Sequence, residues 1–212
     1  MDRKTYLTIV LVAAATAFIG GFLSHLAFMD TIIDAQTFRL VDQNRNVRAE
    51  LGFLPDGGPQ FSLYNADGRI VTTMGLFDGL PIFSFLDQRG TSRLFLSLDP
   101  DGSPTLELTD RHKNPRVRFH LESNGNPLLS CAGTNGKIRL KLGLLKDESP
   151  FLGLSGRRGN VRALLGLERG ERPLLDLIDD NSTSRILMGL LDTGDPMLKF
   201  MDRRGRVIKT EP

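Results

Sequence analysis

Residues 81–103 read PIFSFLDQRGTSRLFLSLDPDGS, and variants of this stretch recur along most of the 212-residue chain. The recurring marker is a proline, found at Pro59, Pro81, Pro104, Pro127, Pro150, Pro173 and Pro196, with Gln36 one period before the first. Successive prolines lie 22 residues apart once and 23 residues apart thereafter. A fixed period of this length is the signature of a repeat architecture. We therefore expect units beginning near residues 36, 59, 81, 104, 127, 150, 173 and 196 to fill residues 36–212.

Each unit is expected to contain two strands. Counting from the proline as position zero, the residues at +2 and +4 are apolar in all eight units and those at +15 and +17 in the first seven. In the quoted unit they are Phe83, Phe85, Leu96 and Leu98. Apolar residues two apart, bracketed by turns, indicate strands with one face toward a core. The stretches 87–90 and 99–102 begin with Asp and end with Gly, which is typical of type I turns. Proline suits the first residue of a strand because it has no backbone donor.

Two architectures satisfy this pattern. Antiparallel hairpins added side by side would form one sheet roughly 70–75 Å long, whereas a β-solenoid would stack its coils over about 35 Å. The turn chemistry favours hairpins, but an open sheet would expose an apolar face, which soluble proteins avoid. A column of arginines at +12, which stacked solenoid coils would bring into repulsive contact, also favours hairpins. We predict an all-β domain of antiparallel hairpin repeats that curl to close their own core, with a β-solenoid as the alternative.

The N-terminus differs from the repeats. Residues 6–28 contain no Asp, Glu, Lys or Arg, and as a helix they would span roughly 34 Å, enough for a bilayer core of ~30 Å. Arg3 and Lys4 precede this stretch and Asp30 and Asp34 follow it, so the positive-inside rule keeps residues 1–5 in the cytoplasm. We predict a transmembrane helix at 6–28, a linker at 29–35 and a repeat domain outside the cytoplasmic membrane.

A cleaved signal peptide is the alternative for this segment. It would need a shorter apolar run and a small-x-small cleavage site, whereas His25, Leu26 and Ala27 precede Phe28. Within the predicted helix, Ala13, Ala17 and Gly21 recur every four residues. Small residues at that spacing allow two membrane helices to approach closely, although they are also common in single membrane helices.

The remaining residues give little sign of catalysis. The 27 Lys and Arg nearly balance the 25 Asp and Glu, so a nucleic-acid partner is not expected. Cys131 occupies the +4 column, where it replaces a Leu or Phe and is expected to act as a small apolar side chain. His112 and His120 have no second His or Cys at metal-ligand spacing. We expect no catalytic residues, no metal site and no cofactor.

Two features of the outward face are candidates for partner binding. The arginine column comprises Arg48, Arg93, Arg116, Arg139, Arg162 and Arg185, with Val71 in the second unit. These side chains either bind carboxylates or phosphates of an anionic polymer or pair with acidic neighbours such as Glu50, Glu107 and Asp176. Leu164 and Leu187, at +14, form the second candidate. At +16, glycine recurs, which indicates bending or close backbone approach.

In unit length and two-strand composition the chain resembles bacterial hairpin-repeat proteins of the MORN and YD types. It lacks their Tyr-x-Gly and Tyr-Asp signatures, so no membership and no functional residue follow. From the residues we expect a non-enzymatic, membrane-anchored scaffold in the bacterial periplasm that binds other proteins or itself. The alternative is a binding module for an anionic envelope polymer that uses the arginine column.

Overall fold

The computed structural model describes residues 2–27, 33–55, 57–168 and 171–211. The chain divides into two units, Met1–Gln36 and Thr37–Pro212. The first unit contains a single helix, α1 (Arg3–Ala27), which Asp2 caps by accepting a 2.7 Å hydrogen bond from the backbone nitrogen of Thr5. This bond lowers the pKa of the Asp2 carboxyl, as expected for an acidic residue at the N-terminus of a helix.

Among the described residues, no helix combines the length and the apolar character that a membrane crossing requires. The assignment of residues 6–28 as a transmembrane helix thus stays a prediction, and Phe28 lies outside the described part of the chain.

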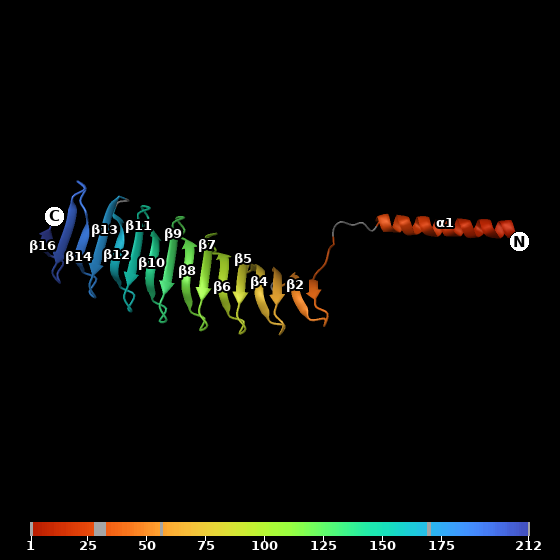
Figure 1. Cartoon of the computed structure of the whole chain (residues 1–212), viewed down its shortest axis with the longest axis horizontal. Coiled ribbons are helices and arrows are strands. Elements are labelled where there is room, and N and C mark those ends of the chain that lie inside the picture. The colour runs from red at the N-terminus through yellow and green to blue at the C-terminus, as the bar shows by residue number, and fades with distance from the viewer. Residues whose placement is uncertain (1, 28–32, 56, 169–170, 212) are drawn as a thin grey trace. The chain divides into compact units, whose positions relative to one another are not determined.

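The second unit is one sheet of sixteen antiparallel strands in which spatial order follows sequence order (Figure 1). The strands are β1 (Phe38–Val41), β2 (Val47–Phe53), β3 (Pro59–Tyr64), β4 (Ile70–Phe77), β5 (Leu80–Leu86), β6 (Ser92–Leu98), β7 (Pro104–Thr109), β8 (Pro115–Leu121), β9 (Pro127–Ala132), β10 (Ile138–Leu144), β11 (Pro150–Ser155), β12 (Val161–Glu168), β13 (Arg172–Ile178), β14 (Ser184–Leu190), β15 (Pro196–Met201) and β16 (Val207–Glu211). The prediction of antiparallel hairpin repeats is confirmed. A β-solenoid would instead pair strands of successive coils in parallel.

The expectation that the hairpins close their own core is wrong. Every contact between described strands joins sequence neighbours, and β1 does not meet β16. A meander of this kind lacks the long connection that would carry a strand back across the sheet. The described strands therefore form one open layer, whose two faces lie uncovered by any other strand.

The turns follow the predicted geometry. In the turn between β5 and β6, Gly90 donates its backbone N–H to the carbonyl of Asp87, and Asp87 donates to the carbonyl of Thr91, both at 2.9 Å. Gly90 has φ 73°, so this is a type I turn followed by a left-handed residue, a common hairpin connection. Lys113, which replaces this glycine two turns later, keeps φ at 65°. The geometry of the turn is therefore retained even where the favoured residue is missing, at some cost in strain.

Glycines at +16 permit close approach between neighbouring strands. A Cβ added to Gly189 would lie 2.5 Å from the carbonyl oxygen of Pro173, and one added to Gly166 would lie 2.8 Å from that of Pro150. Gly75 and Gly143 meet the carbonyls of Pro59 and Pro127 in the same way. The expected close backbone approach is thus confirmed, and the approaching backbone belongs to the preceding strand of the same chain.

Replacing Gly189 by Ala should therefore destabilise the sheet by about 1–3 kcal/mol, because the new methyl group overlaps a backbone oxygen that cannot rotate away. Gly52→Ala is the matched control: its Cβ would meet only side-chain atoms, at 3.6 Å or more. That change should be neutral or slightly stabilising, since Ala loses less entropy than Gly on folding. Urea unfolding followed by circular dichroism measures both, and equal midpoints for the two variants would contradict this account.

Candidate functional site

The largest uncovered surface is the face that the sequence assigned to a core, here called the apolar face. Its outer row alternates the +4 and +13 residues and its central row alternates the +2 and +15 residues, because paired strands place these positions opposite each other. The central row reads Phe38, Leu51, Phe61, Met74, Phe83, Leu96, Leu106, Phe119, Leu129, Leu142, Leu152, Leu165, Leu175, Met188, Leu198 and Glu211. A third row holds the repeat prolines and the +17 residues. From β1 to β15 the three rows contain no charged residue.

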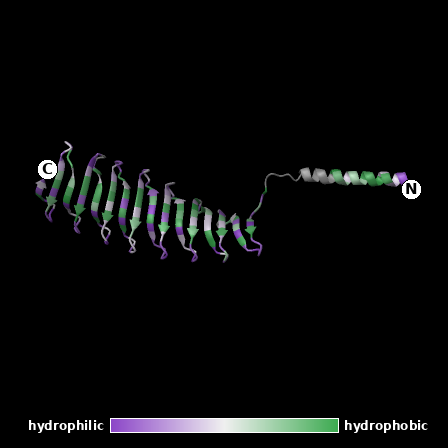
Figure 2. Cartoon of the chain, viewed as in Figure 1, coloured by the Kyte–Doolittle hydropathy of each residue, from purple (hydrophilic) through white to green (hydrophobic). Residues whose placement is uncertain are grey.

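These side chains are accessible to solvent. Met74 is 55% exposed, Phe119 49% and Met188 50%, all in the central row. An apolar hollow of about 610 Å³ lies against this face between β4 and β8, with Phe83, Leu96 and Phe119 in its lining. Figure 2 shows apolar and polar residues alternating along the strands, as a sheet with one apolar face requires. Since monomeric soluble proteins rarely expose more than about 300–600 Å² of contiguous apolar surface, this face is a candidate interaction surface.

The opposite, mixed face is better covered although it is less apolar. Its buried residues include Ser62, Thr73, Ser84, Thr105 and Ser130, and among apolar residues Leu128. The prediction that the apolar columns form the buried face was wrong, because it required a second layer to cover them. On the mixed face, small residues lie between longer neighbours that cover them, so burial here needs no second layer.

The six arginines lie on the mixed face, where each is the extra residue of a β-bulge. Ser92 pairs with Leu86 and Leu94 with Phe85, which leaves Arg93 unpaired between them. A bulge redirects the side chain of its extra residue. Arg93 consequently donates from Nε to the carbonyl of Thr109 at 2.7 Å, in the first strand of the next hairpin. Its Nη1 lies 3.3 Å from the carboxylate of Asp87, in the turn of its own hairpin.

The same contact recurs along the sheet. Nε donates to a backbone carbonyl of the next hairpin from Arg116 to Ala132, from Arg139 to Ser155, from Arg162 to Ile178 and from Arg185 to Met201, at 2.7–2.8 Å. Arg48 reaches the carbonyl of Asn65 through Nη1. We call this contact the arginine staple, because it joins each hairpin to the one that follows.

The acidic partners of the staples are turn residues. Asp42, Asp87, Asp110 and Asp179, each six positions before its arginine, pair with Arg48, Arg93, Arg116 and Arg185. Glu50, Glu107 and Asp176, which were expected in this role, are not the partners of these four arginines. The Asp-x5-Arg spacing in the sequence could have identified the aspartate partners. No sequence pattern could have identified the carbonyl acceptors, because every residue carries a carbonyl.

Units without this turn aspartate keep the staple but change its acidic partner. Gly133 and Gly156 replace the aspartate before Arg139 and Arg162. Arg162 pairs instead with Asp180 of the following turn, and Arg139 has no acidic partner among the described residues. Because the arginines donate within the sheet, their geometry is that of internal contacts, and the binding of an anionic polymer by this column stays a prediction.

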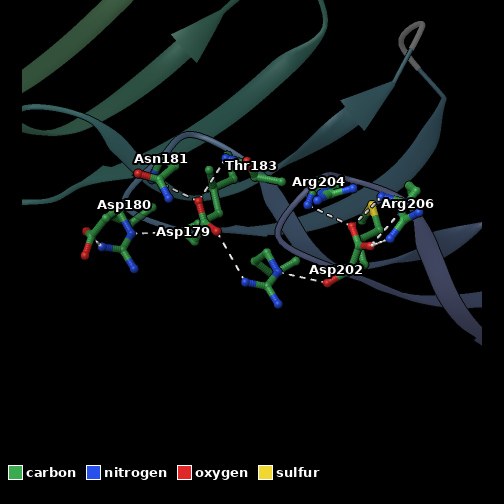
Figure 3. Close-up of polar contacts among 11 residues, drawn as sticks. Asp179, Asp180, Asn181, Thr183, Asp202, Arg204 and Arg206 are labelled. Atoms are coloured by element: carbon green, nitrogen blue, oxygen red, sulfur yellow. Dashed lines mark hydrogen bonds and ion pairs between the residues drawn. The ribbon is translucent and has the colours of Figure 1, made fainter.

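The turn aspartates also bind the backbone of their own turn. Figure 3 shows Asp179 accepting from the backbone nitrogens of Asn181 and Thr183, and Asp202 accepting from those of Arg204 and Arg206. In the turn between β7 and β8, hydrogen bonding from the backbone of Asn114 lowers the pKa of Asp110 to about 2. These carboxylates therefore stabilise the turns in their ionised form.

The other predicted site residues are not brought together. Leu164 and Leu187 lie half-buried on the mixed face, on either side of Asp176 in the intervening strand. Ala13 and Ala17 are exposed on α1, and the surroundings of Gly21 lie outside the described side chains.

The residues considered for chemistry also lie apart. Cys131 is half-buried on the apolar face, as its column predicted. His120 pairs with Thr105 and Leu128 on the mixed face. Within the described residues, no three His, Cys, Asp or Glu side chains are arranged to hold a metal ion.

The two edges along which the turns lie differ in charge. The basic turn edge comprises residues 42–46, 65–69, 87–91, 110–114, 133–137, 156–160, 179–183 and 202–206. Its turns carry eleven Lys and Arg against seven Asp, and the six staple arginines lie beside them. Among the described residues, the acidic turn edge comprises 54–55, 57–58, 78–79, 99–103, 122–126, 145–149, 171 and 191–195. Its described residues include nine Asp and Glu against one Lys. The near-neutral composition thus conceals a strong polarity across the sheet.

No family model and no curated protein matches the chain. Among solved structures, the wild-type TCP10 domain of Danio rerio CPAP is similar at 14% identity, over 85% of this chain and 98% of that domain, with a TM-score of 0.29. A porin-like protein from Bacteroides uniformis is similar at 7% identity, over 82% of this chain and 86% of that protein, with a TM-score of 0.21. Both TM-scores are too low to support a functional inference.

The arginine staple can be tested by replacing Arg116 with Lys. Lysine keeps the charge but lacks the planar fork that bonds a carbonyl and a carboxylate together. We expect a loss of about 1 kcal/mol in the free energy of unfolding, because the bonds are charge-assisted but partly exposed. Arg89→Lys, in a turn where the described residues show no partner for the side chain, should change stability little. Chemical unfolding that shows equal losses for both variants would refute the staple.

The turn carboxylates make stability depend on pH in acid. Because the folded state lowers the pKa of Asp110 from 3.8 to about 2, its contribution is complete above pH ~4 and is lost as pH falls through ~2. Asp110→Asn should reduce the slope of thermal midpoint against pH in this window while keeping the turn. Asn65 already accepts the same backbone bonds in its own turn. The reciprocal change, Asn65→Asp, should increase the slope; unchanged slopes in both variants would contradict the assignment.

Proposed function

We propose that this chain is a non-enzymatic scaffold whose apolar face binds protein, held outside the cytoplasmic membrane by its N-terminal helix. The observation that carries the proposal is the unbroken apolar face, which runs from β1 to β15 without a charged residue and remains exposed. A surface of this size is costly to leave in water and is characteristic of interaction sites.

The shape of this face suits a protein better than a small ligand. Binding pockets for small molecules enclose most of the ligand, with a few polar groups that orient it. On strands β1 to β15, the apolar face has no charged group that could orient a ligand. A long, open and repeating face instead suits another sheet or an extended apolar partner, which would pack against it at about 10 Å.

The membrane anchor and the periplasmic location rest on sequence. Residues 6–28 carry no acidic or basic side chain other than His25, and Arg3 and Lys4 favour a cytoplasmic N-terminus. An anchored sheet would remain at the membrane, where a partner in the same compartment can reach its apolar face.

A single charge placed on the apolar face tests the binding role. Tagged full-length chain, extracted from membranes in mild detergent, should co-purify with a stable protein partner or as a defined oligomer. Phe119→Glu should reduce this association at least tenfold, because burying an unpaired carboxylate in an apolar interface is strongly unfavourable. Lys141→Glu is the matched control, an exposed position on the mixed face, and should leave association unchanged.

The outcomes separate the two parts of the proposal. If the Phe119→Glu variant still binds the same partner, the apolar face is not the binding surface. In the same membranes, an alkaline wash should leave the chain in the pellet. Release into the wash would overturn the anchor while leaving the binding role standing.

A further inference from the structure

We infer that the occupant of the apolar face is a second copy of this chain, related to the first by a two-fold rotation about the long axis of the sheet. In this arrangement β1 lies over β1 and β16 over β16, and the basic turn edge of each copy lies over the acidic turn edge of the other. The inference deepens the proposed function and rests on it, since it names the partner of the proposed binding face.

The area of the face suits such a pair. Sixteen strands about 4.8 Å apart, each roughly six residues long at ~3.3 Å per residue, give a face of roughly 1,500 Å². Two copies face to face would bury about 3,000 Å² together, within the range of obligate homodimers and well above the ~1,600 Å² total of ordinary complexes. A second copy also matches the length of the face and supplies an equally uncharged surface along all of it.

The charge of the edges selects one of two symmetric arrangements. Identical sheets can lie face to face by rotation about the long axis or about an axis parallel to the strands. The second operation stacks the basic turn edge on the basic turn edge and the acidic on the acidic. The first stacks the net basic edge of each copy over the net acidic edge of the other, although the turn at 179–183 contains Asp179 and Asp180 and no Lys or Arg. This net complementarity favours association and fixes orientation.

The last strand supports the same choice. Lys209 and Glu211 are the charged residues that enter the outer and central rows, both on β16, and they form an ion pair with each other. Rotation about the long axis places them over β16 of the second copy, at the end of the pair, where each of the two facing Glu211 carboxylates keeps its own Lys209 as partner. The other rotation would press them onto Phe38 and Leu40 of β1, which would bury charges against apolar side chains.

The aligned arrangement also agrees with the position of the N-terminal segment in the chain. Each chain enters its sheet at β1, so two aligned copies begin at the same end of the pair. The two N-terminal segments, and with them the proposed anchors, then start from one end of the pair, whereas the opposed arrangement would place the two entry points at opposite ends.

Site-specific cross-linking in membranes tests the inference on the full-length chain. In a Cys131→Ala background, Met74→Cys and Met188→Cys each place one thiol in the central row, which lies over itself in the aligned pair. A bis-maleimide with a spacer of about 10 Å, the distance between packed sheets, should link each variant to itself. The product should have twice the 23.5 kDa mass of the chain. Lys141→Cys, exposed on the mixed face, should give no such product.

Each other outcome overturns the inference in a distinguishable way. In the opposed pair Met74 of β4 would lie over β13, roughly 40 Å from its own copy, so neither variant would link to itself. An adduct of different mass would mean that another protein covers the face, which retains the proposed function and removes the second copy. Absence of any adduct would remove the aligned pair, and the Phe119→Glu co-purification would then decide whether the proposed function stands. Equal linking of Lys141→Cys would show random collision.

Charge reversal tests the role of the edges. Glu148 lies in the acidic turn between β10 and β11, which the aligned pair places near Arg157 and Arg158 of the other copy. In mild detergent at low salt, Glu148→Lys with Glu171→Lys should weaken dimerisation several-fold, as exposed ion pairs allow. Adding Arg157→Glu and Arg158→Glu should restore it, as measured by analytical ultracentrifugation. Further weakening in the combined variant would contradict the aligned pair.

Discussion

Backbone pairing between strands adjacent in sequence is the interaction on which this sheet depends. Each described strand contacts only the one before it and the one after it, so no packed second layer adds to the hydrogen-bonded ladder. Stability is then a sum of contributions from each hairpin and from each junction between hairpins, as in other repeat proteins. The arginine staple matters because it acts at the junctions, where Arg93 or Arg116 connects its own hairpin to the backbone of the next.

The two faces consequently have different roles. On the mixed face, glycines such as Gly189 allow the backbone of the preceding strand to approach closely, and small residues such as Ser84 are buried among their neighbours. This face can complete its packing within one chain. The apolar face cannot, since residues such as Met74 and Phe119 have only their row neighbours to contact. The hydrophobic free energy of this face remains available for association.

Much of the sheet could be predicted from the sequence because its determinants are local. The proline period, the apolar columns and the Asp-to-Gly turns each act within a few residues, and all three gave the correct strands and the correct antiparallel order. The closed core could not be predicted, because closure depends on whether distant strands meet, and no local pattern encodes that. The staple was missed for a related reason: the bulge at Arg93 changes where the side chain points, while the alternation of residues shows only which face it lies on.

Repetition gives the apolar face its area but little information about register. A partner displaced along the sheet by one unit, two strand spacings or about 9.6 Å, would meet almost the same side chains, since Leu96 is replaced by Phe119 and Leu98 by Leu121. Apolar contact is also non-directional, so it opposes such a slip only weakly. Orientation must therefore come from features that distinguish the two edges and the two ends of the sheet, which here are the opposite charges of the turn edges and the ion pair on β16. In a single-layer repeat protein, the face supplies affinity, and the edges and the terminal strand decide what can bind in which direction.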